Sequence, residues 1–285
     1  MLNFSFKKSS AQNSTGKVIS VLNQKGGVGK TTMTFNVARA LAERGHKVLC
    51  IDMDPQANLS LLFGVDSNEL DFHIYHLLIN SLKDLKPLHT PVIVDEVIVT
   101  KKFQKVSIDI LPAGQELSGF ELSVAGVVAP RQLILKKLIE KSSLKSQYDF
   151  ILIDGPPTLG LVVVNILCAT DGLLVPFQPD QFSQKGLSHF HNVLGDIEEM
   201  GITTSPKILG YIPNLVDNRR KQTVGDFDLI RQDLQGKVFA EFGNRVQLVK
   251  SSSQKKSVFD YQAKDYRPLQ EQFLSMAQHI EQELV

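Results

Sequence analysis

A glycine-rich segment with two lysines and two threonines lies near the beginning of the chain and has the composition of a phosphate-binding loop. Its residues are Gln24-Lys25-Gly26-Gly27-Val28-Gly29-Lys30-Thr31-Thr32. The segment leaves an apolar run and enters a helical pattern, a context in which glycines let successive backbone N–H groups turn toward phosphate oxygens. The Lys30 ammonium can neutralise the charge of the outer phosphates, and the Thr31 hydroxyl can ligate Mg²⁺. An ordinary turn between a strand and a helix is the alternative interpretation.

Three carboxylates follow apolar runs at places where strands are expected to end. Asp52 and Asp54 belong to the segment Ile51-Asp52-Met53-Asp54-Pro55-Gln56, and Asp154 comes directly after the apolar residues 150–153. Open α/β sheets bind ligands at the carboxyl ends of their strands. We therefore expect these acids beside the phosphate loop, with Asp154 holding Mg²⁺ through water. The alternative is that one of the acids, Asp52 in particular, caps the next helix.

These side chains are expected to be positioned by an α/β fold, a mostly parallel twisted sheet flanked by helices on both faces. From Lys17 onward, short apolar runs alternate with helical patterns, and most runs are too uniformly apolar for half-exposed strands. The predicted strands are Val18–Leu22, Val48–Ile51, Val106–Leu111, Phe150–Ile153, Leu173–Val175, Ile208–Ile212 and Val246–Val249. The predicted helices are Lys30–Arg44 with Gly45 as its stop, Ile74–Ile79, Arg131–Ser142, Leu161–Ala169, Ser183–Met200, Asp226–Gln235 and Pro268–Leu284.

Length and composition favour one large domain in the cytoplasm. The chain has 285 residues, 42% of them hydrophobic, and we expect a flexible tail at residues 1–16 and a single domain at residues 17–285. Cys50 and Cys168 lie in apolar runs, which is typical of reduced, packed thiols. No apolar stretch approaches the ~20 residues of a transmembrane helix. Lys and Arg number 31 against 30 Asp and Glu, so any nucleic-acid binding must come from a local patch.

The phosphate loop departs from the general pattern, because Gln24 stands where that pattern has glycine and is followed by an additional lysine, Lys25. With this lysine the chain resembles the deviant Walker A family of ParA, Soj and MinD. The resemblance implies an ATPase that binds ATP and Mg²⁺ and forms an ATP-dependent homodimer, in which Lys25 reaches the nucleotide of the other subunit. It also implies that Asp54 positions the attacking water and that Asp52 belongs to the Mg²⁺ shell. The candidate catalytic residues are therefore Lys25, Lys30 and Asp54.

Three later segments also resemble members of this family. Thr158 and Gly160 complete the pattern that follows the third carboxylate. Residues 175–180, Val-Pro-Phe-Gln-Pro-Asp, resemble a segment that lies near the dimer interface and the base. Pro213 and Asn214 stand where relatives contact adenine. Either of the last two segments could be no more than a turn.

The last third of the chain is locally basic, with 12 Lys and Arg against 7 Asp and Glu from Met200 to Arg267. In DNA-binding ParA relatives, basic residues of this region contact the phosphates of nonspecific DNA. By resemblance, the candidates here are Arg219, Arg220, Lys255 and Lys256. A loop expected at residues 250–256 replaces the family's usual Glu-Ala and glycine with serines and lysines, which favours phosphate contact over membrane binding. A solvated charged surface is the alternative.

The resemblance also implies a ParB-like adaptor protein and a nucleoid-associated location in the cytoplasm, with no membrane partner. A MinD-like membrane positioner would need a C-terminal amphipathic helix with a basic polar face, whereas Glu271–Val285 is acidic at its polar positions and is expected to pack on the core. A nitrogenase-reductase-like protein would need cysteines poised to hold an iron–sulfur cluster, which Cys50 and Cys168 do not offer.

Two further hypotheses about function fit all of these motifs. One is a ParA-like ATPase that moves a protein cargo, and the other is a regulatory module that holds ATP without useful turnover. The expected catalytic role of Asp54 argues against the module. Only about sixteen residues precede the first predicted strand, so we expect no helix-turn-helix region for operator binding.

Overall fold

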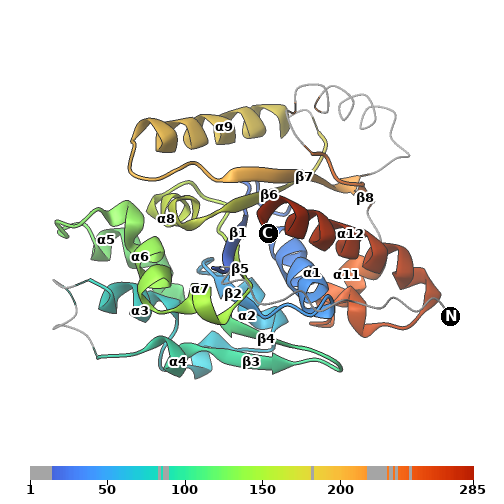
Figure 1. Cartoon of the computed structure of the whole chain (residues 1–285), viewed down its shortest axis with the longest axis horizontal. Coiled ribbons are helices and arrows are strands. Elements are labelled where there is room, and N and C mark those ends of the chain that lie inside the picture. Colours follow the sequence, from blue (N-terminus) through green and yellow to red (C-terminus); the bar gives the residue numbers. More distant parts are fainter. Residues whose placement is uncertain are drawn as a thin grey trace.

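An eight-stranded sheet forms the centre of the fold (Figure 1). The computed structural model describes residues 15–82, 85, 90–180, 183–216, 230, 234, 237–243 and 246–285. Its strands are β1 (Lys17–Val21), β2 (Val48–Asp52), β3 (Val99–Lys102), β4 (Ser107–Leu111), β5 (Phe150–Asp154), β6 (Gly172–Phe177), β7 (Lys207–Val216) and β8 (Phe242–Gly243). Their order is β3-β4-β2-β5-β1-β6-β7-β8, and every neighbouring pair is parallel except β3 and β4.

Helices cover both faces of this sheet, as the alternating sequence pattern predicts (Figure 1). One face is covered by α1 (Lys30–Glu43), α2 (Asn58–Leu62), α11 (Val246–Ser253) and α12 (Arg267–Leu284). The other is covered by α3 (Ile74–Asn80), α5 (Phe120–Ser123), α6 (Ile134–Lys141), α7 (Leu144–Gln147), α8 (Leu161–Ala169) and α9 (Ser183–Glu199). The short helix α4 (Val94–Val97) precedes β3. No helix in the described part of the chain combines the length and apolarity needed to cross a bilayer.

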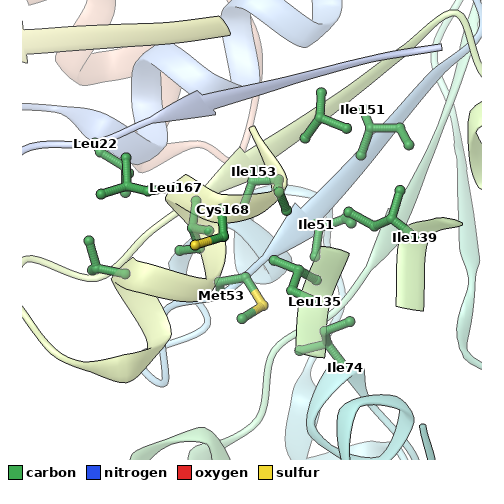
Figure 2. Close-up of a cluster of buried hydrophobic side chains, with 14 of the residues drawn as sticks. Leu22, Ile51, Met53, Ile74, Leu135, Ile139, Ile151, Ile153, Leu167 and Cys168 are labelled. Carbon is green, nitrogen blue, oxygen red and sulfur yellow. The ribbon is translucent and has the colours of Figure 1, made fainter. Parts of the chain in front are cut away.

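The sheet separates two hydrophobic clusters, because successive side chains of a strand point to opposite faces. In β2, Leu49 and Ile51 belong to one cluster, whereas Val48 and Cys50 belong to the other. Figure 2 shows the first cluster, in which side chains of the central strands meet those of α6 and α8. Both cysteines are buried and unpaired, in agreement with the reduced thiols expected from the sequence. The central strands are thus held on both sides, which gives the loops at their carboxyl ends a fixed base.

Most predicted elements are confirmed, and one is wrong. Residues 246–249 form the first turn of helix α11 and are not a strand. The buried side chains of α11 are Leu248 and Ser251, three residues apart as on one face of a helix, whereas Val246 and Val249 are 75% and 57% exposed. The predicted loop at residues 250–256 therefore begins as helix.

Other differences concern missed strands and the end of one strand. The edge strands β3 and β8 are absent from the sequence prediction, since they are short and lack a continuous apolar run. Strand β7 runs on through Pro213 and Asn214, which the sequence places after the strand. Gly45 has a φ of 97°, as expected of the stop after α1. The predicted tail at residues 1–16, the predicted helix at residues 226–235, and Arg219 and Arg220 lie wholly or mostly outside the described residues.

A buried asparagine joins the C-terminal segment to the helix that follows the phosphate loop. Asn36 of α1 is 1% exposed, and its Oδ1 accepts hydrogen bonds from the Ser257 hydroxyl and from the Val258 N–H, both at 2.9 Å. Its Nδ2 donates to the Thr32 carbonyl at 2.8 Å. One side chain thus connects the start of α1 to the residues that follow α11.

We predict that Asn36→Ala lowers the free energy of unfolding by about 2–4 kcal/mol, because it leaves two buried donors without an acceptor. Urea unfolding followed by circular dichroism measures this loss. Asn68→Ala is the matched control, since Asn68 is exposed and its side chain donates to the nearby Asp66, and it should change stability by less than ~0.5 kcal/mol. Equal losses in the two variants would contradict the anchoring role of Asn36.

Candidate nucleotide site at the carboxyl end of the sheet

The register of the central strands brings the predicted carboxylates to one level. In the parallel pairs, Asp154 of β5 lies opposite Asp52 of β2 on one side and opposite Val21 of β1 on the other. The Met53 N–H continues the ladder by donating to the Asp154 carbonyl at 2.9 Å. Because β1 leads directly into the glycine-rich loop, the loop and the acids share the same edge of the sheet.

Left-handed glycines shape the loop, and two asparagines hold it. Gly27 and Gly29 have φ values of 77° and 90°, which favour glycine, and a Cβ on Gly29 would lie 2.4 Å from Asn214 Nδ2. The same Nδ2 donates to the Val28 carbonyl at 2.8 Å. At the start of the loop, Asn23 Nδ2 donates to the Pro176 carbonyl in β6 at 2.8 Å. The Asn23 Oδ1 accepts from the Lys25 N–H at 2.9 Å. The loop is therefore tied to β6 and β7 before any ligand is present.

The second lysine of the loop is buried at the start of α1. Lys30 is 7% exposed, and its Nζ donates to the Lys25 carbonyl at 3.2 Å. Burial lowers the pKa of Lys30, and the charges of Asp154 and Asp54 oppose this shift only in part. A buried ammonium whose neighbouring carboxylates do not fully replace its lost hydration is stabilised by a further anion. The phosphates of a nucleotide would supply that negative charge.

The carboxylates have too little positive charge in their surroundings. Burial raises the pKa of Asp154, and the charges of Asp52 and Asp54 raise it further, although hydroxyls of α1 counteract the shift. Those hydroxyls are Thr31 Oγ1, which donates to Asp154 Oδ2 at 2.7 Å, and Thr34 Oγ1, which donates to Oδ1 at 3.1 Å. A divalent cation near Asp154 would relieve this repulsion between neighbouring negative charges.

This donor set fits Mg²⁺ better than a metal that is bound by protein ligands alone. Within the described residues, no three His, Cys, Asp or Glu side chains are grouped so that they could hold a metal ion. Mg²⁺ usually keeps several waters and is bound through one or two carboxylates together with substrate phosphates. Thr31 and Asp154 supply a hydroxyl and a carboxylate of that kind beside the phosphate loop.

Asp52 is engaged within its own segment. It is fully buried, its Oδ2 accepts from the Ser60 N–H and from the Ser60 hydroxyl, both at 2.8 Å, and its Oδ1 accepts from the Asp54 N–H at 3.2 Å. Burial raises the pKa of Asp52 despite these hydrogen bonds. The structure thus shows a positioning role for Asp52 in the turn that carries Asp54, and its place in the Mg²⁺ shell stays a prediction.

A cavity of about 600 Å³ opens over the loop. Asp54 reaches it, is 8% exposed, and accepts from the Gln56 N–H at 2.9 Å. The residues that line the cavity are Gly26, Gly27, Gly29, Lys30, Thr31, Thr32, Asp54, Gln56, Asn58, Leu61, Leu62, Pro157, Ser252, Ser253 and Lys255. The cavity therefore combines the phosphate loop, one carboxylate and the end of α11.

The first lysine of the loop is not among the described residues that line this cavity. Lys25 forms an ion pair with Asp180, which follows β6, and the two side chains are 37% and 30% exposed. Asp180 is the last residue of the segment that resembles the family's interface region. Within one subunit the two lysines of the loop thus have different surroundings, one buried over the cavity and one at the surface in an ion pair.

Not all predicted binding residues reach the cavity. Pro213 and Asn214 are buried in β7 and are not among the described residues that line it, although Asn214 contacts the loop through the Val28 carbonyl. Lys255 lines the cavity, whereas the Lys256 ammonium lies over the Tyr261 ring, 5.8 Å from its centroid. The two lysines, which the sequence groups as DNA contacts, therefore have separate environments.

Sequence reasoning missed several residues that hold the site together. Asn23 and Asn36 fix the loop and the C-terminal segment, Thr34 bonds to Asp154, and Ser60 bonds to Asp52. A signal existed only for Asn23, a polar residue directly after an apolar strand. The partners of Thr34 and Asn36 are far away in sequence. The contact of Ser60 with Asp52 depends on how the chain turns back between β2 and α2, so spacing alone could not identify these residues.

We predict that Asn214→Ala weakens nucleotide binding about tenfold, because the Val28 carbonyl loses its donor and the loop is no longer held. Asn214→Asp should weaken binding more, about a hundredfold, since a carboxylate there repels both the carbonyl and the phosphates. Titration calorimetry with Mg²⁺ and ADP measures both. Asn80→Ala, on α3, serves as the control with unchanged affinity. An aspartate variant that binds as tightly as the unmodified chain would refute this role.

Comparison with known proteins agrees with this geometry. A sequence profile of the AAA domain family matches residues 16–207. The chain is 30% identical to the sporulation initiation inhibitor protein Soj of Bacillus subtilis over 224 residues, which are 79% of this chain and 82% of that protein. It is 31% identical to the chromosome partitioning protein ParA of Caulobacter vibrioides over 232 residues, which are 81% of this chain and 78% of that protein.

The fold is shared with a solved structure, an ATP complex of McdA from Cyanothece. The TM-score is 0.80 at 21% identity, and the match covers 94% of this chain and 97% of that one. At that identity the likeness concerns the fold alone. The sequence matches decide the family: the chain belongs to the ParA/MinD family of P-loop ATPases.

Proposed function

We propose that this chain is a ParA-type partition ATPase, which dimerises on ATP, binds DNA without sequence preference and releases it after hydrolysis stimulated by a ParB-like partner. The observation that carries the proposal is the pair of loop lysines, with Lys30 buried over the cavity and Lys25 at the surface in an ion pair. Similarity to proteins named Soj and chromosome partitioning protein ParA supports partition as the process.

The residues around the cavity suit ATP hydrolysis. Lys30 would bind the outer phosphates, the loop N–H groups would bind their oxygens, and Thr31 and Asp154 would hold Mg²⁺. When bound, Mg²⁺ neutralises charge that develops on the phosphates during transfer. Asp54 borders the cavity and would orient the attacking water, while its segment is held in place through Asp52.

The surface lysine makes hydrolysis depend on dimerisation. Lys25 cannot stabilise charge in its own cavity, since it does not line that cavity and is paired with Asp180. In the proposed dimer it would leave Asp180 and reach the nucleotide of the second subunit, where a cation stabilises the transition state. ATP binding, association and turnover would thereby be coupled through one side chain.

We propose that the ATP-bound dimer binds to DNA. The phosphates of the DNA would be bound by basic residues of the last third of the chain, with Lys255 and Lys256 the candidates whose surroundings the structure describes. The dimer would double that surface. Arg219 and Arg220 remain candidates outside the described residues. A ParB-like adaptor is proposed from the resemblance alone.

A membrane-binding role is disfavoured by the last helix. α12 buries Leu269, Phe273, Met276, Ala277 and Ile280 against the core, so its apolar face is already covered. An interfacial helix needs that face for lipid. A ParA-like ATPase with a protein cargo shares the whole site, and the identity of the cargo adaptor distinguishes it from DNA partition.

The ATPase proposal predicts different defects for two residues. Asp54→Ala should bind ATP and accumulate as a dimer while turnover falls at least about a hundredfold, as expected for loss of a group that positions water. Lys25→Ala should bind nucleotide but remain monomeric, since its side chain lies outside the cavity. Light scattering with ATP and phosphate release with DNA measure these properties.

Lys207→Ala is the control for the two ATPase variants, because that lysine pairs with Glu283 at the surface and should leave both properties unchanged. Normal ATP-dependent dimers of Lys25→Ala would refute the proposed coupling. Equal turnover after Asp54→Ala would favour a regulatory module that only holds ATP.

The DNA assignment predicts a salt dependence. Binding of the ATP-bound protein to random duplexes should weaken with salt, with a log–log slope of about −0.9 per neutralised phosphate, and should hardly depend on sequence. Charge reversal at Lys256 together with Arg219 and Arg220 should reduce the slope. Filter binding over a salt series measures it, and a flat dependence would remove DNA from the proposed function.

A further inference from the structure

The end of helix α11 has an unusual backbone conformation. Lys255 has a φ of 53°, in the left-handed region that side chains with a Cβ adopt only at a cost in free energy. Its N–H donates to the Ser252 carbonyl at 3.0 Å, and the Lys256 N–H donates to the Ser251 carbonyl at 2.9 Å. Such a left-handed residue commonly closes a helix, and glycine is the usual choice. Here a lysine occupies that position.

This helix end forms one wall of the candidate nucleotide cavity. Ser252, Ser253 and Lys255 line the same cavity of about 600 Å³ as the phosphate loop. The Ser252 hydroxyl lies 3.3 Å from the Thr32 hydroxyl, so the wall touches the first turn of α1. Asn36 anchors the residues that follow this wall to α1, which fixes the distance between them.

Within the described part of the chain, the charge of Lys255 has no ion-pair partner. Among the described residues, no carboxylate lies within 4.0 Å of its ammonium, whereas Lys25 is paired with Asp180. Lys256, its neighbour, is placed over the Tyr261 ring. Lys255 is thus a second cation at the cavity, beside Lys30, and it stands on the wall that touches Thr32.

We infer that Lys255 binds the nucleotide, with its ammonium on the phosphates that ATP and ADP share. This inference rests on the proposed function. We place the ammonium at the inner phosphates because the end of α11 contacts Thr32 through Ser252. Thr32 lies one residue beyond the Lys30–Thr31 pair, which suits the outer phosphates and Mg²⁺. Lys255 is therefore a nucleotide ligand supplied by the C-terminal segment, and the end of α11 lines the site together with the phosphate loop.

The test compares variants of Lys255 in the full chain by calorimetric titration with Mg²⁺ and either ATP or ADP. Lys255→Gln should raise both dissociation constants about fivefold to tenfold, the loss expected for one partly exposed charge-assisted hydrogen bond. Lys255→Arg, which keeps the charge, should stay within about twofold of the unmodified chain. Lys207→Gln is the matched control, because Lys207 pairs with Glu283 at the surface, and it should also stay within about twofold.

A glycine variant separates binding from folding. Lys255→Gly should lose affinity as Lys255→Gln does, while its melting temperature is unchanged or higher, because glycine suits the left-handed conformation. Unchanged affinity for both nucleotides in Lys255→Gln and Lys255→Gly would overturn the inference, and reduced DNA retention in those variants would assign Lys255 to the DNA surface instead. A loss confined to ATP would overturn the placement on the shared phosphates.

The proposed function is tested separately in the same titrations. Lys30→Ala should abolish measurable binding of both nucleotides. If that variant binds normally, the nucleotide site itself is wrong. If it fails to bind while the Lys255 variants bind normally, the site stands and only the inference about Lys255 falls.

Discussion

Buried charge at the carboxyl end of the sheet is the constraint on which the rest of the structure depends. An ammonium and three carboxylates, Lys30 with Asp52, Asp54 and Asp154, are buried within the fold. Desolvation penalises the charges of Lys30, Asp52 and Asp154, as the lowered pKa of Lys30 and the raised pKa values of the two acids show. A nucleotide and a divalent cation remove both penalties at once. The arrangement of these side chains therefore favours that combination of ligands.

The surrounding architecture serves to keep these charges in place. Two hydrophobic clusters hold the central strands from both faces, and the parallel register puts Asp52 and Asp154 side by side. Hydrogen bonds from Ser60, Thr31 and Thr34 then fix the carboxylates. Such side chains gain little stability for the chain as a whole, but they prevent the acids from relaxing toward water. The site is thereby preorganised for its ligands, which reduces the cost of binding them.

Sequence reasoning predicted what depends on short spacing and uniform burial. It located the central strands, the helix after the loop and the loop itself, since each has a continuous local pattern. It misjudged residues 246–249, because a four-residue apolar run fits a strand as well as a helix and only the buried pair Leu248 and Ser251 decides between them. It could not find Asn36 or the Lys25–Asp180 pair, whose partners lie more than 150 residues away. Long-range contacts have no signature in a single sequence.

In the proposed mechanism, the separation of the two loop lysines would let one short motif both bind the nucleotide and couple its hydrolysis to association of two subunits. Lys30 is committed to the cavity by burial, so it contributes whether or not a second subunit is present. Lys25 is half-exposed and held by an ion pair, and such surface pairs contribute only ~0–1 kcal/mol. A contact with triphosphate in a closed interface, where water is excluded, can therefore outcompete Asp180 at little cost. Once the outer phosphate is lost, the contact across the interface would be lost with it, and Lys25 would return to Asp180 as the subunits separate.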